Sequence, residues 1–300
     1  MHISLCPRLK ADRAVFRCDR KEGLSVKTTR EWLLQLCASV AGMIIIPLDF
    51  DSPAKAIAMV DQMVAKGVKF FKVGLELIMT GEFASVVRHI IAVGGAVFLD
   101  GKLSDIPNTV AGAVKSLVRL GVHMINMHCL SGLEAMKAAR EAAEAEAVAL
   151  GLEMRPLVIG VTILTSLDYA NLFYMGLMNR SPDGINFENE KAAVQYVVVQ
   201  LALLAKEAGL DGVVASAQHV RAIKAACGRD FLVVTPGIRF ADGDVQDQKQ
   251  VVTPAIAIAD GSDFLVMGRP LTKPANGDIA GAVARAAREI EEGLAARAAA

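Results

Sequence analysis

The sequence predicts an α/β protein whose main domain is a single (β/α)₈ TIM barrel. From position 43 onward, eight short aliphatic runs alternate with longer segments of helical periodicity. Hydrophobic residues make up 53% of the chain but aromatic residues only 5%, so aliphatic side chains must fill the core, as suits parallel strands buried on both faces. An open doubly wound sheet is the alternative, but no Gly-x-Gly-x-x-Gly follows the first strand.

The predicted elements are bounded by these changes of periodicity. The predicted strands span residues 43–48, 70–74, 96–99, 124–127, 157–162, 212–215, 232–235 and 264–267. The predicted helices span residues 54–66, 82–93, 109–120, 132–150, 190–208, 220–226, 254–259 and 279–294. The segment 171–187 reads as a long irregular loop, to which we assign no role.

Residues 1–42 differ from the rest in charge, because they carry eight Lys/Arg and four Asp/Glu, a net charge of +4, which leaves −4 for residues 43–300. The whole chain has a formal net charge of zero, which gives no electrostatic indication of a nucleic-acid or membrane partner. The uncharged stretch 32–48 falls short of the ~20 residues of a spanning helix and contains Pro47, so we interpret it as a short helix at about 28–39 followed by a strand. We therefore expect an N-terminal extension, 1–42, of unknown role and a barrel domain, 43–300.

The five cysteines are scattered, with no Cys-x-x-Cys and no Cys/His cluster. This distribution indicates neither a disulfide framework nor a metal site. Reduced thiols in a cytoplasmic protein are the simpler interpretation.

Charged residues gather where the predicted second and third strands end, which is the end of a barrel that carries active sites. Asp100 and Lys102 are two residues apart, so their side chains point to one face, while Val97 and Leu99 have the opposite parity and point to the helices. By the same parity, Lys72 points into the barrel mouth. A purely structural ion-pair network is the alternative, because such networks also pair buried charges.

Lys102 has three possible roles. It could form a Schiff base, it could bind phosphate, or it could stay protonated and deliver a proton to a carbanion. The carboxylates of Asp100 and Asp105 flank it in the sequence and stabilise its charged form, so they favour the third role.

The ends of the seventh and eighth predicted strands carry Gly237 and Gly268, each followed closely by an arginine, Arg239 or Arg269. Barrel enzymes often bind phosphate at this place through backbone N–H groups and arginine forks, and Gln248 in the following loop can add donors.

Three further polar residues follow strand ends. Asp49 ends the first strand and could bind a ribose hydroxyl or cap the next helix. Thr165 and Ser166 follow the fifth strand, where they could be ordinary turn residues or hydrogen-bond a base or carboxylate.

At these residues the sequence resembles the orotidine 5′-phosphate decarboxylase family. Residues 98–109, Phe-Leu-Asp-Gly-Lys-Leu-Ser-Asp-Ile-Pro-Asn-Thr, resemble the family's signature segment almost throughout. Similar segments follow in family order at 43–50, 71–74, 161–166, 234–239 and 266–270, and Gln248 matches the glutamine of the phosphate loop. Residues 1–42 have no counterpart.

The resemblance implies decarboxylation of orotidine 5′-monophosphate to uridine 5′-monophosphate and CO₂ in pyrimidine biosynthesis, without a cofactor or metal. Lys102 would protonate C6 of the pyrimidine within an alternating network of Lys72, Asp100, Lys102 and Asp105. The resemblance also implies a homodimer, in which Asp105 and Thr109 reach the partner's site. The remaining substrate contacts would be Asp49 and Lys72 on the ribose, Thr165 and Ser166 on the pyrimidine, and Arg239, Gln248, Gly268 and Arg269 on the phosphate.

Two rival interpretations remain open. One is a sister barrel lyase that acts on a sugar phosphate with magnesium, a keto-sugar-phosphate decarboxylase or a hexulose-phosphate synthase. Segments 106–109 and 236–239 disfavour this sister lyase, because they resemble the orotidine 5′-phosphate decarboxylase family. The other is a barrel that only binds a ligand, but a decayed site would have lost some of its charges, and all four are present.

Overall fold

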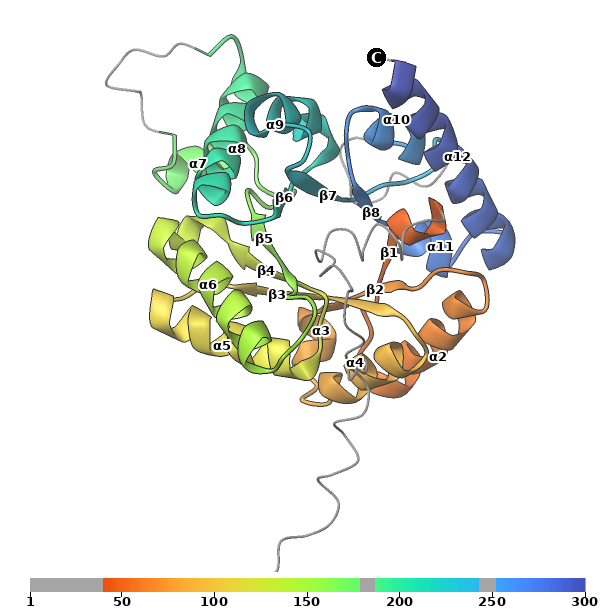
Figure 1. The fold of residues 1–300 in the computed structure, drawn as a ribbon. Helices are drawn as coiled ribbons and strands as arrows, with labels where there is room; N and C mark the ends of the chain where they lie inside the picture. Colours follow the sequence, from red (N-terminus) through yellow and green to blue (C-terminus); the bar gives the residue numbers. More distant parts are fainter. Residues whose placement is uncertain (1–39, 179–186, 243–251, 300) are drawn as a thin grey trace, which may run out of the picture.

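A closed barrel of eight parallel strands forms the centre of the protein (Figure 1). The structure, a computed structural model, describes residues 40–178, 187–242 and 252–299. The strands pair in sequence order, and β1 closes against β8. They are β1 Ile44–Pro47, β2 Phe70–Gly74, β3 Ala96–Leu103, β4 Met124–His128, β5 Leu157–Val161, β6 Gly212–Val214, β7 Leu232–Pro236 and β8 Phe264–Val266. The predicted fold class and all eight predicted strands are confirmed.

Helices surround the barrel (Figure 1). They are α2 Pro53–Val64, α3 Leu75–Ile78, α4 Phe83–Ala92, α5 Pro107–Leu120, α6 Leu133–Ala149, α7 Tyr169–Tyr174, α8 Glu190–Glu207, α9 Val220–Cys227, α10 Pro254–Ala259, α11 Arg269–Thr272 and α12 Ile279–Ala299. Short 3₁₀ turns are η2 Val40–Met43, η3 Cys129–Ser131 and η4 Ala217–His219. The predicted helix at 28–39 lies outside the described residues. None of the helices in the described ranges has the length and apolar character needed to span a bilayer.

The segment interpreted as an irregular loop begins, in fact, within helix α7. The carboxylate of Asp168 accepts the backbone N–H of Asn171 at 3.1 Å, and the side-chain oxygen of Asn171 accepts the N–H of Asp168 at 3.1 Å. This reciprocal capping satisfies donors that the first turn of a helix leaves unpaired. The prediction was therefore wrong for the first residues of 171–187.

Each strand buries both of its faces, one in the barrel interior and one against the helices. Phe71 and Val73 of β2 belong to the outer core beneath the helices, whereas Phe70 belongs to the inner core. The rings of Phe70 and Phe264 meet edge to face inside the barrel, with centroids 5.6 Å apart. The inner core consists of Ile45, Phe70, Ala96, Phe98, Met124, Leu157, Ile159, Leu232, Val234, Phe264 and Val266. The predicted parity of β2 and β3 is confirmed.

The parallel register brings the ends of the first three strands together. Lys72 is paired with Pro47 of β1 and with Phe98 of β3, and Gly74 is paired with Asp100. Because all strands run the same way, the polar residues that end them meet at one mouth of the barrel.

Candidate active site

Four charged side chains form a chain of ion pairs at this mouth. Lys72 Nζ lies 3.2 Å from Asp49 Oδ1 and 3.0 Å from Asp100 Oδ2. Lys102 Nζ lies 2.8 Å from Asp100 Oδ1. Charges therefore alternate in sign from the exposed Asp49 through the largely buried Lys72 and Asp100 to the partly exposed Lys102, so each buried charge has a partner of opposite sign.

Asp100 is the centre of this chain and is only 7% exposed. Burial alone would raise the pKa of its carboxyl, but Lys72, Lys102 and a hydrogen bond from Asn126 outweigh burial and lower the pKa. Burial alone would likewise lower the pKa of Lys72, but Asp100 and Asp49 outweigh it and raise the pKa. Asp100 and Lys72 are therefore both charged at neutral pH.

A glycine makes room for the pair between Lys72 and Asp49. A Cβ at Gly74 would lie 2.8 Å from Lys72 Nζ and 3.2 Å from Asp49 Oδ1. A side chain at this last residue of β2 would therefore push the ammonium group out of the chain of ion pairs.

Lys102 has an unusual backbone conformation, with φ at 47° in the left-handed region. The pairing of β3 with β4 shifts its register between Leu99 and Leu103, so Lys102 lies in an irregularity of the strand. Its N–H donates to Asn126 Oδ1 at 2.8 Å. The side chain of Lys102 points at Asp100, as the sequence predicts. The irregular backbone at Lys102, and not the regular alternation of a strand, gives it this direction.

Asn126 of β4 is a further member of the site that the strand-end pattern does not indicate. It is fully buried, and its Nδ2 donates to Asp100 Oδ1 at 2.6 Å while its oxygen accepts the N–H of Lys102. Its amide thus links the two residues to which the sequence assigned the chemistry. The available signal was a polar residue two positions after Met124 in the predicted strand 124–127, which is otherwise apolar, with the parity of the barrel interior.

His128, the last residue of β4, also lies in the electrostatic field of this network. Burial lowers its pKa first, and the positive charge of Lys102 lowers it further against the opposite effect of Asp100. A neutral imidazole at pH 7 follows, so His128 adds no positive charge to the mouth.

Asp105 and Thr109 do not join the network within one chain. Both are exposed, and Asp105 Oδ1 accepts the N–H of Ile106 at 2.7 Å. In the described part of the chain, Asp105 forms no ion pair with Lys72 or Lys102. The structure thus brings together three of the four predicted network residues and adds Asp49 to them.

The candidate phosphate residues end neighbouring strands. Gly268 follows β8 closely, and a Cβ there would lie 3.1 Å from Pro47 Cγ of β1. Arg269 begins α11 and is exposed, while Arg239 follows β7 and is partly buried. Gln248 lies outside the described residues.

The candidate pyrimidine residues lie on the loop between β5 and α7. Thr165 and Ser166 are both exposed. Their hydroxyl groups are therefore available to a ligand at the same end of the barrel as Lys102.

This arrangement presents a fixed ammonium group beside a buried carboxylate. An ammonium group held in this way can stabilise negative charge that develops on a substrate and can then donate a proton. Within the described ranges, no three His, Cys, Asp or Glu side chains gather as a set of metal ligands.

The sequence model of the family described as "Orotidine 5'-phosphate decarboxylase / HUMPS family" matches residues 42–286. The chain belongs to this family. The match begins at the strand-forming part of the chain and covers every element from β1 into α12.

Individual members of the family are similar to this protein in sequence over most of the chain. The orotidine 5′-phosphate decarboxylase of Moorella thermoacetica is 45% identical over 248 residues, which are 83% of this chain and 92% of that protein. That of Vibrio cholerae strain O395 is 44% identical over 236 residues, 79% of this chain and 94% of the relative. The crystal structure of orotidine 5′-phosphate decarboxylase from Lactobacillus acidophilus superposes with a TM-score of 0.64 at 30% identity and covers 82% of this chain and 98% of its own.

Proposed function

We propose that the protein decarboxylates orotidine 5′-monophosphate to uridine 5′-monophosphate and CO₂, a step of pyrimidine biosynthesis. The observation that carries this proposal is the ammonium group of Lys102, which the buried carboxylate of Asp100 holds at 2.8 Å inside the barrel mouth. Relatives that bear the name of this activity match most of the chain at 44–45% identity.

The proposed reaction needs no electron sink other than this charge. The bond between C6 and the carboxylate breaks, CO₂ leaves as a neutral molecule, and the electron pair stays on C6. Lys102 stabilises the carbanion electrostatically and then transfers a proton from Nζ to C6. The neutral amine regains its proton from solvent before the next turnover.

Asp100 has two effects in this scheme. It fixes the position of Lys102 through the 2.8 Å ion pair, which lowers the entropy cost of reaching the reactive geometry. It also crowds the carboxylate of the substrate with like charge in the ground state.

The remaining mouth residues are proposed to bind the parts of the substrate that do not react. We assign the ribose to Asp49 and Lys72 and the pyrimidine to Thr165 and Ser166. The phosphate is assigned to Arg239, Gly268, Arg269 and Gln248. Binding energy from the phosphate can be used to lower the barrier at C6.

We further propose a homodimer with shared sites. Asp105 and Thr109 are exposed within one chain, which leaves them free to reach the site of a partner. Ile106 beside them is 66% exposed, and Met79, which follows α3, is 75% exposed. The proposed dimer contact would cover both of these apolar side chains.

Residues 43–300 are proposed to form the catalytic domain, and residues 1–42 an extension on which the chemistry does not depend. The family match from residue 42 supports this division. A cytoplasmic location is proposed from the metabolic role and from the scattered cysteines, two of which, Cys129 and Cys227, are free and buried.

A direct assay tests the activity. Purified protein is incubated with orotidine 5′-monophosphate and EDTA, and ultraviolet absorbance follows the loss of the substrate. Turnover that persists in EDTA is expected. If chelation abolished turnover and magnesium restored it, the magnesium-dependent sister lyase would be favoured instead.

The variant Lys102→Ala tests the mechanism. It is expected to lose all measurable decarboxylation while it still binds uridine 5′-monophosphate, because the phosphate contacts remain. Near-normal turnover by this variant would end the proposed role of Lys102.

A further inference from the structure

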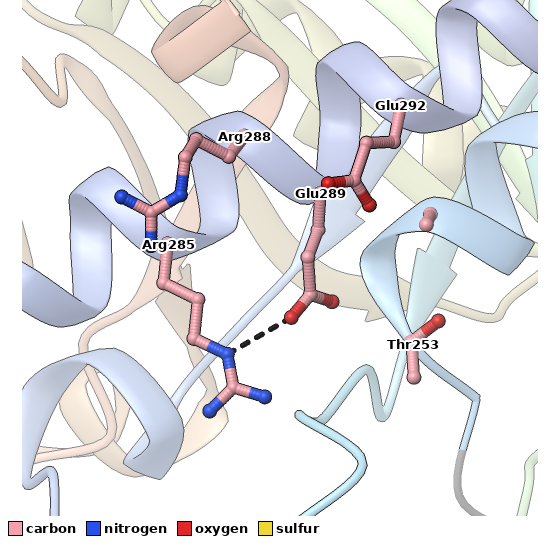
Figure 2. Close-up of a pocket in the computed structure, with 6 residues that line it drawn as sticks. Thr253, Arg285, Arg288, Glu289 and Glu292 are labelled. Carbon is pink, nitrogen blue, oxygen red and sulfur yellow. Dashed lines mark hydrogen bonds and ion pairs between the residues drawn. The ribbon is translucent and has the colours of Figure 1, made fainter.

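Arg285 of α12 contacts the segment that follows β7. Its Nη1 donates to Asp242 Oδ2 at 2.9 Å, and its Nε donates to Glu289 Oε1 at 2.9 Å one turn later in α12. Its guanidinium carbon lies 4.2 Å from the ring centroid of Phe240. Figure 2 shows the link between Arg285 and Glu289. One side chain of the C-terminal helix thus holds two residues of a loop that is distant in the sequence.

The segment that Arg285 holds leads directly from a proposed phosphate ligand. Phe240 follows Arg239 and is only 8% exposed, so its ring is an anchored surface for the guanidinium. The N–H of Arg239 donates to the carbonyl oxygen of Val252 at 3.2 Å, which joins the two ends of the connection between β7 and α10. Displacement of Phe240 would therefore be transmitted to the backbone of Arg239.

An open surface pocket adjoins Arg285. It has a volume of about 350 Å³ and lies between α12 and the start of α10 (Figure 2). Its lining is formed by Thr253, Ala255, Arg285, Arg288, Glu289 and Glu292. Because open space adjoins the side chain, packing cannot fix Arg285 from that side, and its ion pairs must do so.

The geometry points to Arg285 as a positioning residue for phosphate binding, an inference that rests on the proposed function. The planar guanidinium contacts an aromatic face and two carboxylates at the same time, which the ammonium group of a lysine could not reproduce. By fixing Phe240 and Asp242, Arg285 holds the backbone of Arg239 where the phosphate of the substrate binds. Arg285 itself touches no substrate in this scheme.

The competing explanation is that Arg285 only fastens α12 to the barrel. That role would affect stability and would weaken all ligands alike. A positioning role would weaken ligands that carry the phosphate and spare the nucleoside part. The comparison of a nucleotide with its nucleoside therefore separates the two explanations.

The experiment compares Arg285→Met with Arg288→Met, which changes an exposed arginine on the same helix and the same cavity. The dissociation constants of uridine 5′-monophosphate and uridine are measured by titration calorimetry, together with the melting temperature and with turnover of orotidine 5′-monophosphate. For Arg285→Met, a roughly tenfold weaker binding of the nucleotide is expected, with uridine unchanged. Arg288→Met is expected to stay within about twofold of the wild type.

Further variants and outcomes complete the test. Asp242→Asn should weaken nucleotide binding in part, and should add little when combined with Arg285→Met, because both changes break one interaction. Equal losses for uridine and the nucleotide, or no loss for either, would overturn the positioning role. Wild-type protein that bound the nucleotide without decarboxylating its 6-carboxy precursor would contradict the proposed function but not this inference. Wild-type protein that did not bind the nucleotide would contradict both.

Discussion

The backbone N–H of Lys102 donates a hydrogen bond of 2.8 Å to the side-chain oxygen of Asn126, a residue 24 positions later in the chain. The same amide donates from its nitrogen to Asp100 Oδ1 at 2.6 Å. Lys102 has a φ of 47°, a conformation that costs free energy for a residue with a side chain. Asn126 compensates for this cost and at the same time stabilises the anionic form of Asp100.

Asn126→Ala should lower kcat about 10- to 100-fold with little change in the affinity for nucleotide, because a misplaced Lys102 impairs the chemical step and not the phosphate contacts. The variant also removes a hydrogen bond that lowers the pKa of Asp100, so that pKa rises. The acid limb of the kcat profile should therefore move to higher pH. Steady-state kinetics over a pH series measure both effects.

Thr235→Val is the matched control for this change. It removes a buried hydrogen bond of 2.7 Å to Ser262 on the helix-facing side of β7, away from the charged network. It should cost stability but leave kcat and its pH profile unchanged. An equal fall in kcat for both variants would show that Asn126 has only a structural role.

Mixed dimers test whether Asp105 acts across subunits. Asp105→Asn and Lys102→Ala should each be inactive alone. If the subunits mix at random in equal amounts, half of the dimers are mixed and one of their two sites is intact, so about a quarter of the wild-type activity should return. An absence of recovery, in a sample shown to exchange subunits, would place both residues in the same subunit's site.

His219 makes stability depend on pH. It is 5% exposed, and burial lowers its pKa from 6.5 to about 4. As the pH falls below 6.5, His219 is protonated in the unfolded chain but stays neutral in the folded protein. The free energy of unfolding should therefore fall between pH 6.5 and about 4, by an amount on the order of 3 kcal/mol from this group.

The variant His219→Phe should lose this part of the pH dependence, since phenylalanine does not titrate. Urea unfolding at pH 7 and at pH 4.5 measures the difference. His123, whose pKa burial also lowers to about 4, should preserve the rest of the slope. A slope that is the same in the variant and the wild type would contradict the assignment to His219.

Gly293 allows α12 to pack closely on α10. A Cβ at this position would lie 2.6 Å from the carbonyl oxygen of Ala255 and 2.8 Å from Ile258 Cβ. Gly293→Ala should therefore destabilise the protein by about 1–3 kcal/mol. Gly112→Ala in α5, where nothing lies within 4 Å of the added atom, is the control, and its stability should rise by about 0.5–1 kcal/mol. Thermal unfolding that ranked the two variants in the opposite order would refute this account.

The barrel could be predicted from the sequence because its strands are short aliphatic runs. Lys72, Asp100 and Lys102 could be assigned to one mouth because side chains alternate along a strand and active sites lie at strand ends. The structure confirms both the strands and the convergence of these three residues.

What the sequence did not reveal depends on contacts between distant positions. β3 extends to Leu103, four residues beyond its predicted end, because Asn126 supports the irregular backbone at Lys102. The residues close to Lys102 in the sequence give no indication of this hydrogen bond. The role of Arg285 depends in the same way on Phe240 and Asp242, 45 and 43 positions before it. Helix α7, in contrast, carries a local capping signal in Asp168 and Asn171 that could have been recognised.

The closely packed inner core of the barrel also limits the routes by which substrate can enter and products can leave. Eleven side chains of the strands, from Ile45 to Val266, fill the axis, so the barrel formed by the described residues has no open passage to its far end. In the proposed reaction, CO₂ and uridine 5′-monophosphate must both leave through the mouth of the barrel by which the substrate entered. CO₂ is small and uncharged and makes none of the phosphate contacts, so we expect it to leave before the nucleotide does.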